Sequence, residues 1–182
     1  SSQSFFQLSN FYLNLANFLN PNFSSFDSLL AENFYKIDDL ENAKLIYKKL
    51  IKNGDAFKWY SHKQISRILI QEDKKDESLK LLSNSYENLN SKDIYDMFDY
   101  AEFLKNNEEF INSIKIYTEI LKKIEIEHPL FPAVTDGRGV AYERNGQWDK
   151  AEKDLLASLN ANPDQAYVIN YLAYTWIEKG TK

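Results

Sequence analysis

The sequence predicts an all-α fold, a right-handed α-solenoid of about ten helices stacked as antiparallel pairs. Three observations predict it. Small residues recur at intervals close to 35 residues, the apolar residues around them follow the period of about 3.6 residues that is typical of a helix, and the 182 residues include only 5 Gly and 4 Pro. So few turn-forming residues disfavour an all-β sandwich or barrel.

The repeat is carried by three series of residues in the same phase. The first series is small and has separations of 35, 35, 38 and 34 residues: Ala31, Ser66, Ala101, Gly139 and Ala173. A second small residue follows twelve positions after each of the first four: Ala43, Ser78, Ser113 and Ala151. A large residue comes four positions later: Tyr47, Leu82, Tyr117 and Leu155. This pattern indicates a helix–turn–helix unit in which small side chains let helix A and helix B of each pair approach closely.

The helices are expected in order along the chain, each ended by a turn or cap signal. The expected ranges are 4–19, 24–36, 40–53, 57–71, 75–88, 92–106, 110–125, 131–145, 148–160 and 164–180. Asn20-Pro21 ends the first helix, and the turns within pairs fall at Asp38-Asp39, Asp73, Asn106-Asn107 and Gly146. Pro163 is expected to open the last helix. Pro129 and Pro132 exclude a continuous helix where the spacing widens to 38 residues.

One array over residues 1–182 follows from this pattern. Its parts are an unpaired helix B at 1–21, repeats at 24–57, 58–92, 93–130 and 131–165, and an unpaired helix A at 166–182. Because neither end has a polar capping helix, we expect a piece of a longer chain that could self-associate through its uncapped ends.

The residues that carry the repeat resemble the tetratricopeptide repeat family, in particular its bacterial multi-repeat proteins. The fourth unit matches best, through residues in the family's order and spacing: Gly139, Tyr142, Gly146, Trp148, Ala151 and Pro163. The second and third units depart from the pattern, because Ser78 and Ser113 replace the helix-B Ala. The resemblance implies a scaffold without catalysis or cofactor that binds a protein partner's peptide or helix in a concave groove lined by the A helices.

Groove residues can be projected from that resemblance. Those predicted for partner binding are Tyr60, Lys63, Arg67, Tyr95, Phe98, Glu102, Tyr167, Asn170 and Tyr174, with Glu32, Tyr35 and Asp136 beside them. Lys63 and Arg67 are four residues apart on one helix and could bind a carboxylate. For any single one of these residues, a place in the core or on the solvated surface is the alternative.

Composition and spacing argue against other classes of function. The net charge of −5 disfavours a nucleic-acid binder, and no apolar run reaches the roughly 20 residues of a membrane span. His62 and His128 are far apart and there is no Cys, so no metal site is expected. The absence of Cys fits cytoplasm and periplasm equally. The lysine clusters Lys48-Lys49-Lys52 and Lys122-Lys123 are interpreted as solvated faces. The remaining alternatives are an RNA-binding helical-hairpin repeat protein and a scaffold segment of a larger enzyme or assembly factor.

Overall fold

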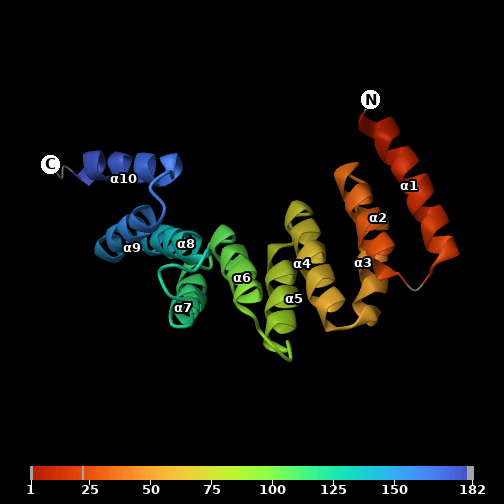
Figure 1. Ribbon diagram of the computed structural model, residues 1–182, viewed down its shortest axis with the longest axis horizontal. Helices are drawn as coiled ribbons and strands as arrows, with labels where there is room; N and C mark the ends of the chain where they lie inside the picture. The colour runs from red at the N-terminus through yellow and green to blue at the C-terminus, as the bar shows by residue number, and fades with distance from the viewer. Residues whose placement is uncertain (1, 22, 180–182) are drawn as a thin grey trace. The chain divides into compact units, whose positions relative to one another are not determined.

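The computed structural model describes residues 2–21 and 23–179, which form ten α-helices and no strand (Figure 1). The helices are α1 Ser2–Leu19, α2 Ser24–Lys36, α3 Leu40–Leu50, α4 Asp55–Gln71, α5 Lys75–Glu87, α6 Ile94–Asn106, α7 Phe110–Leu121, α8 Phe131–Arg144, α9 Trp148–Ala161 and α10 Ala166–Lys179, with a short 3₁₀ helix, η1, at Ile51–Asn53. The predicted all-α class and helix number are confirmed. The expected end of the last helix at residue 180 lies outside the described residues.

The chain divides into two compact units, Ser1–Ser91 with α1 to α5 and Lys92–Lys182 with α6 to α10. Within each unit, helices that follow one another in sequence pack together as hairpins: α2 with α3 and α4 with α5 in the first, α6 with α7 and α8 with α9 in the second. The first helix of each pair is called an A helix and the second a B helix. By the same alternation α1 is a B helix and α10 an A helix.

The core of the first unit forms where the small residues allow close contact. Ala31 on α2 and Ala43 on α3 are fully buried beside Tyr47, Leu50 and Ile68. In the next pair Ser66 and Ser78 take the same positions, and the Ser78 hydroxyl donates to the Ser66 carbonyl oxygen at 2.8 Å. A serine is therefore tolerated here because its hydroxyl finds a backbone acceptor.

The second unit uses the same packing with an even closer approach at α8 and α9. A β-carbon placed on Gly139 would lie 2.9 Å from Leu155 Cγ and 3.2 Å from the carbonyl oxygen of Ala151. Leu155 then joins Val168 and Leu172 of α10 in the core. The Arg138 guanidinium binds the buried Asp154 carboxylate through Nε at 2.6 Å and Nη2 at 2.8 Å, which ties α8 to α9.

The turns inside the four pairs share one backbone geometry. Each contains one residue with positive φ: Asp38 at 62°, Asp73 at 58°, Glu108 at 68° and Gly146 at 74°. In each turn the next backbone N–H donates to a carbonyl five residues back: Asp39 to Phe34, Lys74 to Leu69, Glu109 to Leu104 and Gln147 to Tyr142, at 2.8 to 2.9 Å. This is the Schellman arrangement, which satisfies the free carbonyls at the helix end.

Three expectations about helix ends and packing were wrong. Ala173 is exposed, unlike its buried counterparts Ala31 and Ala101, because among the described residues no B helix packs against this face of α10. Pro163 does not open the last helix, since it lies in a bend between α9 and α10, and α10 begins only at Ala166. In the third turn the residue with positive φ is Glu108, one position after the expected Asn106-Asn107.

Candidate functional site

In the first unit, polar and aromatic side chains of α2 and α4 pair across the two A helices. The Tyr60 hydroxyl donates to Glu32 Oε1 at 2.9 Å, and the Arg67 guanidinium lies 4.9 Å from the centre of the Tyr35 ring. Burial raises the pKa of Tyr60 to about 12, with the hydrogen bond to Glu32 adding to the shift, so this phenol stays a donor at neutral pH. The two pairs form a pre-organised polar and aromatic surface, called here the α2–α4 face.

Lys63 takes a different place from Arg67, although both belong to α4. The Lys63 ammonium lies 5.6 Å from the centre of the Trp59 ring, whereas the Arg67 guanidinium lies over the Tyr35 ring. Arg67 also donates to Gln64 Oε1 at 2.6 Å. The two cations are thus each held by a separate aromatic ring.

In the second unit, α6, α7 and α8 meet at Glu102. Lys105 Nζ contacts Glu102 Oε1 at 2.7 Å and Oε2 at 2.9 Å, and the Tyr117 hydroxyl donates to the same carboxylate. A β-carbon on Gly137 would lie 2.6 Å from Tyr117 Oη and 2.9 Å from Glu102 Oε1. Gly137 therefore lets α8 approach this pair. The sequence analysis did not predict a role for Lys105 or Gly137 in this cluster. The signal available in the sequence was a second glycine, Gly137, two positions before Gly139.

Asp136 lies beside this cluster with a mostly buried side chain. Burial raises the pKa of its carboxyl, the Glu102 charge acts in the same direction, and Lys105 opposes both. Its Oδ1 atom is buried without a hydrogen-bond partner. An acid in this state favours a nearby hydrogen-bond donor or cation.

The other predicted residues of the second unit occupy varied positions. Tyr95 and Tyr167 are each 59% exposed, and Asn170 is also exposed. Phe98 is half-buried, with its ring 6.3 Å from that of Tyr117. Tyr174 belongs to α10, but its side chain lies outside the described residues. Exposed aromatic rings of this kind are suited to bury against a partner.

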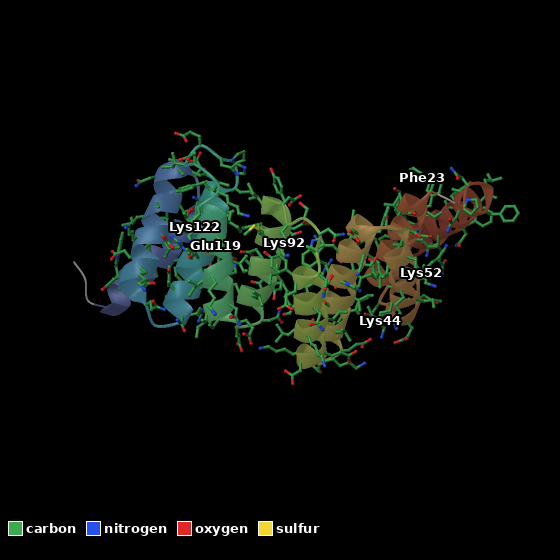
Figure 2. All side chains as sticks on the ribbon, turned by 90° about the horizontal axis from the view of Figure 1, so that it is seen from below. Phe23, Lys44, Lys52, Lys92, Glu119 and Lys122 are labelled. Atoms are coloured by element: carbon green, nitrogen blue, oxygen red, sulfur yellow. The ribbon has the colours of Figure 1, made fainter. Side chains whose placement is uncertain are left out.

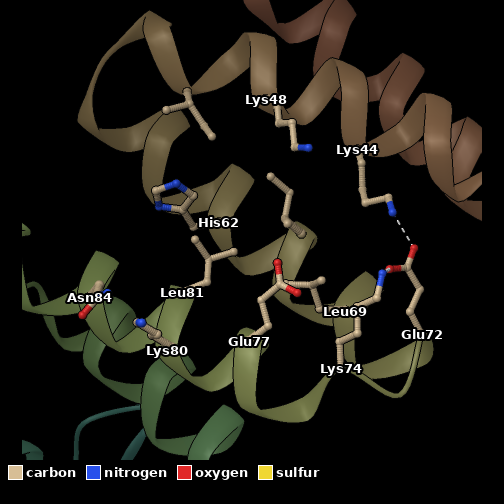
Figure 3. Close-up of a pocket in the computed structure, with 12 residues that line it drawn as sticks. Lys44, Lys48, His62, Leu69, Glu72, Lys74, Glu77, Lys80, Leu81 and Asn84 are labelled. Atoms are coloured by element: carbon tan, nitrogen blue, oxygen red, sulfur yellow. Dashed lines mark hydrogen bonds and ion pairs between the residues drawn. The ribbon is translucent and has the colours of Figure 1, made fainter.

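The B-helix side of the first unit carries a groove that the sequence did not predict (Figure 3). It has a volume of about 510 Å³, and its walls come from α3 and α5 with α4 between them. It is lined by Lys44, Lys48, Ile51, His62, Ile65, Leu69, Glu72, Lys74, Glu77, Lys80, Leu81 and Asn84. The groove was missed because these residues, spread from 44 to 84, meet only in the folded hairpins.

Other B-helix lysines make local ion pairs. Lys122 Nζ lies 2.6 Å from Glu119 one turn away on α7, and the two side chains are seen together in Figure 2. Lys49 Nζ lies 2.8 Å from the buried Asp27, which also accepts from Asn17 Nδ2 at 2.5 Å and so links α1, α2 and α3. Lys49 is therefore part of the packing between helices as well as of a solvated face.

Two kinds of feature are not found in the described part of the chain. Within it no three His, Asp or Glu side chains gather as metal ligands, and no helix combines the length and apolar character needed to cross a bilayer.

The arrangement of hairpins is that of tetratricopeptide repeat proteins, which is the fold class this chain adopts. It is similar to YrrB, described as a TPR protein with an unusual peptide-binding site, with a TM-score of 0.65 and 16% identity over 95% of this chain and 86% of YrrB. It is also similar to the MamA protein, with a TM-score of 0.62 and 17% identity over 91% of this chain and 87% of MamA.

A larger assembly contains the same fold. The chain is similar to a component of the APC/C hetero-tetramer Cut9-Hcn1, with a TM-score of 0.68 and 16% identity, and it covers 34% of that component's length. No model of a protein family and no curated protein matches the sequence. At these identities the similarity establishes the fold alone.

Proposed function

We propose that this chain is a non-catalytic scaffold that binds a peptide or helix of a protein partner on the exposed faces of its A helices. The α2–α4 face carries the proposal, because Glu32, Tyr35, Tyr60 and Arg67 are held in fixed pairs while remaining partly exposed. Side chains that are ordered before binding lose little entropy when a partner arrives. The peptide-binding site described for YrrB, on the same fold, supports this use of the scaffold.

The second unit offers a further set of contacts of the same kind. Tyr95 and Tyr167 are exposed aromatic side chains on A helices, and Asp136 is an acid that lacks a partner for one oxygen. A partner that supplies a cation or an N–H group would satisfy that oxygen after a small shift of side chains. We therefore propose these residues as a partner-binding surface of the second unit, considered by itself.

The test is a selection of random displayed peptides against the immobilised chain, followed by affinity measurement of the enriched peptides by fluorescence anisotropy. Replacing both Tyr35 and Arg67 with Ala removes one complete pair from the α2–α4 face. We expect this double variant to weaken binding about tenfold or more, as loss of an aromatic and Arg anchor does. Tyr60→Phe keeps the ring but loses the donor to Glu32, and a smaller loss is expected.

The matched control is a double variant on B helices, Lys115→Ala with Lys153→Ala, because both lysines are exposed in the second unit. Binding should be unchanged by it. Circular dichroism of every variant checks that helicity is kept. The proposal is contradicted if no peptide is enriched, or if enriched peptides ignore the α2–α4 face and also Tyr95→Ala and Tyr167→Ala.

A further inference from the structure

We propose that the groove between α3 and α5 is a second docking surface, which binds an acidic protein segment through one aliphatic side chain flanked by carboxylates. Its walls are the B helices α3 and α5 and its floor is α4, and none of its lining residues belongs to the α2–α4 face of the proposed function. Its residues all belong to the first unit. Figure 3 shows Lys44 and Lys48 of α3 on one wall of the groove, and Lys80 of α5 with Lys74 just before that helix on the other.

The floor of the groove suits an aliphatic side chain. Ile65 and Leu69 are buried core residues of α4, while Ile51 and Leu81 pack against that core but remain partly exposed. Covering these partly exposed surfaces removes apolar area from water. A volume of about 510 Å³ is within the range of sites that hold a compact ligand group.

The charges at one end of the groove are already fixed by ion pairs. Lys44 Nζ lies 2.5 Å from Glu72 Oε1, and Lys74 Nζ lies 2.7 Å from Glu72 Oε2. Hydrogen bonds from Lys44 and Lys74 lower the pKa of the Glu72 carboxyl, so it stays ionised and holds both lysines at the wall. Lys44 Nζ also lies 2.7 Å from Glu41 Oε1, so the two lysines at this end are balanced by two carboxylates. The unbalanced positive charge of the groove therefore lies farther along its rim.

The rest of the rim adds cations without ion-pair partners. Lys48 of α3 and Lys80 of α5 are exposed, and neither forms an ion pair within the described residues. Glu77 is the one further carboxylate among the lining residues. The lining residues therefore include four Lys and two Glu, and Glu41 pairs with Lys44 beside them, so Lys48 and Lys80 carry the excess positive charge in a chain whose net charge is −5. Such a local reversal of sign favours an acidic partner.

A protein segment fits the groove better than a nucleic acid. Strands of nucleic acid are bound by basic tracks with aromatic rings for stacking, and no Phe, Tyr or Trp lines this groove. Glu72 and Glu77 would repel phosphates, whereas carboxylates of a peptide can be spaced to avoid them. The aliphatic floor has no side chain that could form a hydrogen bond with a base edge.

The experiment uses the whole chain and three fluorescein-labelled peptides. The first has one Leu flanked on each side by Glu residues, the second has Gln in place of every Glu, and the third has Ser in place of Leu. Only the first is expected to bind in fluorescence anisotropy, and its binding should weaken as salt rises above about 0.1 M, since screening shortens the reach of the lysine charges.

Variants of the chain then locate the binding. Lys48→Glu with Lys80→Glu should weaken the affinity for the first peptide tenfold or more. Glu77→Gln should strengthen it, a change that a purely structural role of Glu77 would not produce. Lys115→Glu with Lys153→Glu changes the net charge by the same amount on α7 and α9 and should have no effect.

Four results would overturn the proposal: no binding of the Glu peptide, equal binding of the Gln peptide, insensitivity to the Lys48 and Lys80 reversal, or equal loss with the control pair. Binding of a single-stranded oligonucleotide that depends on Lys48 and Lys80 would also replace the acidic segment as occupant. Any of these outcomes leaves the A-helix proposal standing, because that proposal is tested with Tyr35, Tyr60 and Arg67.

Discussion

Gly139 of α8 faces the backbone of Ala151 in α9 so closely that a β-carbon on Gly139 would lie 3.2 Å from the Ala151 carbonyl oxygen. The opposing group is main chain of a helix, which cannot rotate away as a side chain can. The same hypothetical atom would lie 2.9 Å from Leu155 Cγ. This pair therefore sets the distance between the two helices.

Gly139→Leu should force α8 and α9 apart and lower the free energy of unfolding by about 2 kcal/mol or more, as overpacking of a core does. Thermal denaturation followed by circular dichroism measures the effect. Val140→Leu, one position along on the half-buried side of α8, is the control and should change the melting temperature little. An unchanged melting temperature for Gly139→Leu would mean that the two helices do not pack as described.

Asp73→Gly should stabilise the chain by about 0.5–1 kcal/mol, because Asp73 has a φ of 58° and glycine adopts this region without a steric cost. Urea denaturation measures the change. Asp76→Gly, three residues later inside α5, should instead lower the stability of the chain by about 1 kcal/mol. Glycine in a helix loses more backbone freedom on folding than other residues do. Equal effects of the two substitutions would contradict the turn geometry.

His62 should make the chain less stable under mildly acidic conditions. Burial, with a contribution from the Lys58 charge, lowers the pKa of His62 below 6.5 in the folded state. The unfolded chain then takes up a proton more readily, so the stability contribution present above pH about 6.5 is lost as pH falls toward the folded-state pKa. His62→Gln should reduce the stability difference between about pH 7.5 and pH 5 relative to the unaltered chain.

The control for this prediction is His128→Gln, in the segment before α8. Denaturant unfolding at the two pH values gives the comparison, because carboxylates contribute equally to all three proteins. The Nδ1 atom of His62 lies 2.7 Å from Ser85 Oγ, so Gln is chosen to keep a polar group near Ser85. An undiminished pH dependence in the His62 variant would contradict the assignment.

The exposed face of α1 predicts concentration-dependent association of the chain. Seven large apolar side chains of this helix are 44% to 82% exposed: Phe5, Leu8, Phe11, Tyr12, Leu15, Phe18 and Leu19. The helix carries no charged residue, and an apolar patch of this extent tends to be covered by another protein surface.

Phe11→Glu with Phe18→Glu should abolish this association in sedimentation velocity. Leu45→Glu with Ile111→Glu, at exposed apolar positions of α3 and α7, is the control and should leave it intact. A chain that stays monomeric at high concentration would contradict the prediction, and equal loss with the control pair would place the contact elsewhere.

The helices could be predicted from the sequence because each is specified locally. The bounds of α2 match the expected 24–36, and α8 and α9 differ from expectation by one residue at one end. The small residues at Ala31 and Gly139 mark close contacts that any helical pair would need. Ala173 fails this rule because burial depends on a neighbour that its own helix does not specify.

The candidate surfaces were predicted less completely, for a reason that is also physical. The exposure of Tyr95 and of Tyr167 can be predicted from the pattern of a single helix in each case. The hydrogen bond between Tyr60 and Glu32 depends on how two helices, α2 and α4, pack together. The groove needs three helices at once, so lysines that appear solvated in sequence line a shared cavity in the fold. The more elements a site combines, the less of it a linear pattern reveals.

The four hairpin turns also bear on how such a chain diverges. What recurs at Asp38, Asp73, Glu108 and Gly146 is the sign of one backbone angle and one main-chain hydrogen bond, and three different amino acids provide it. Selection on this geometry leaves the side chain free to drift. The same turn can therefore persist while the amino acid at its positive-φ position changes. A fold built on such turns can stay recognisable in three dimensions when the sequence pattern is no longer clear.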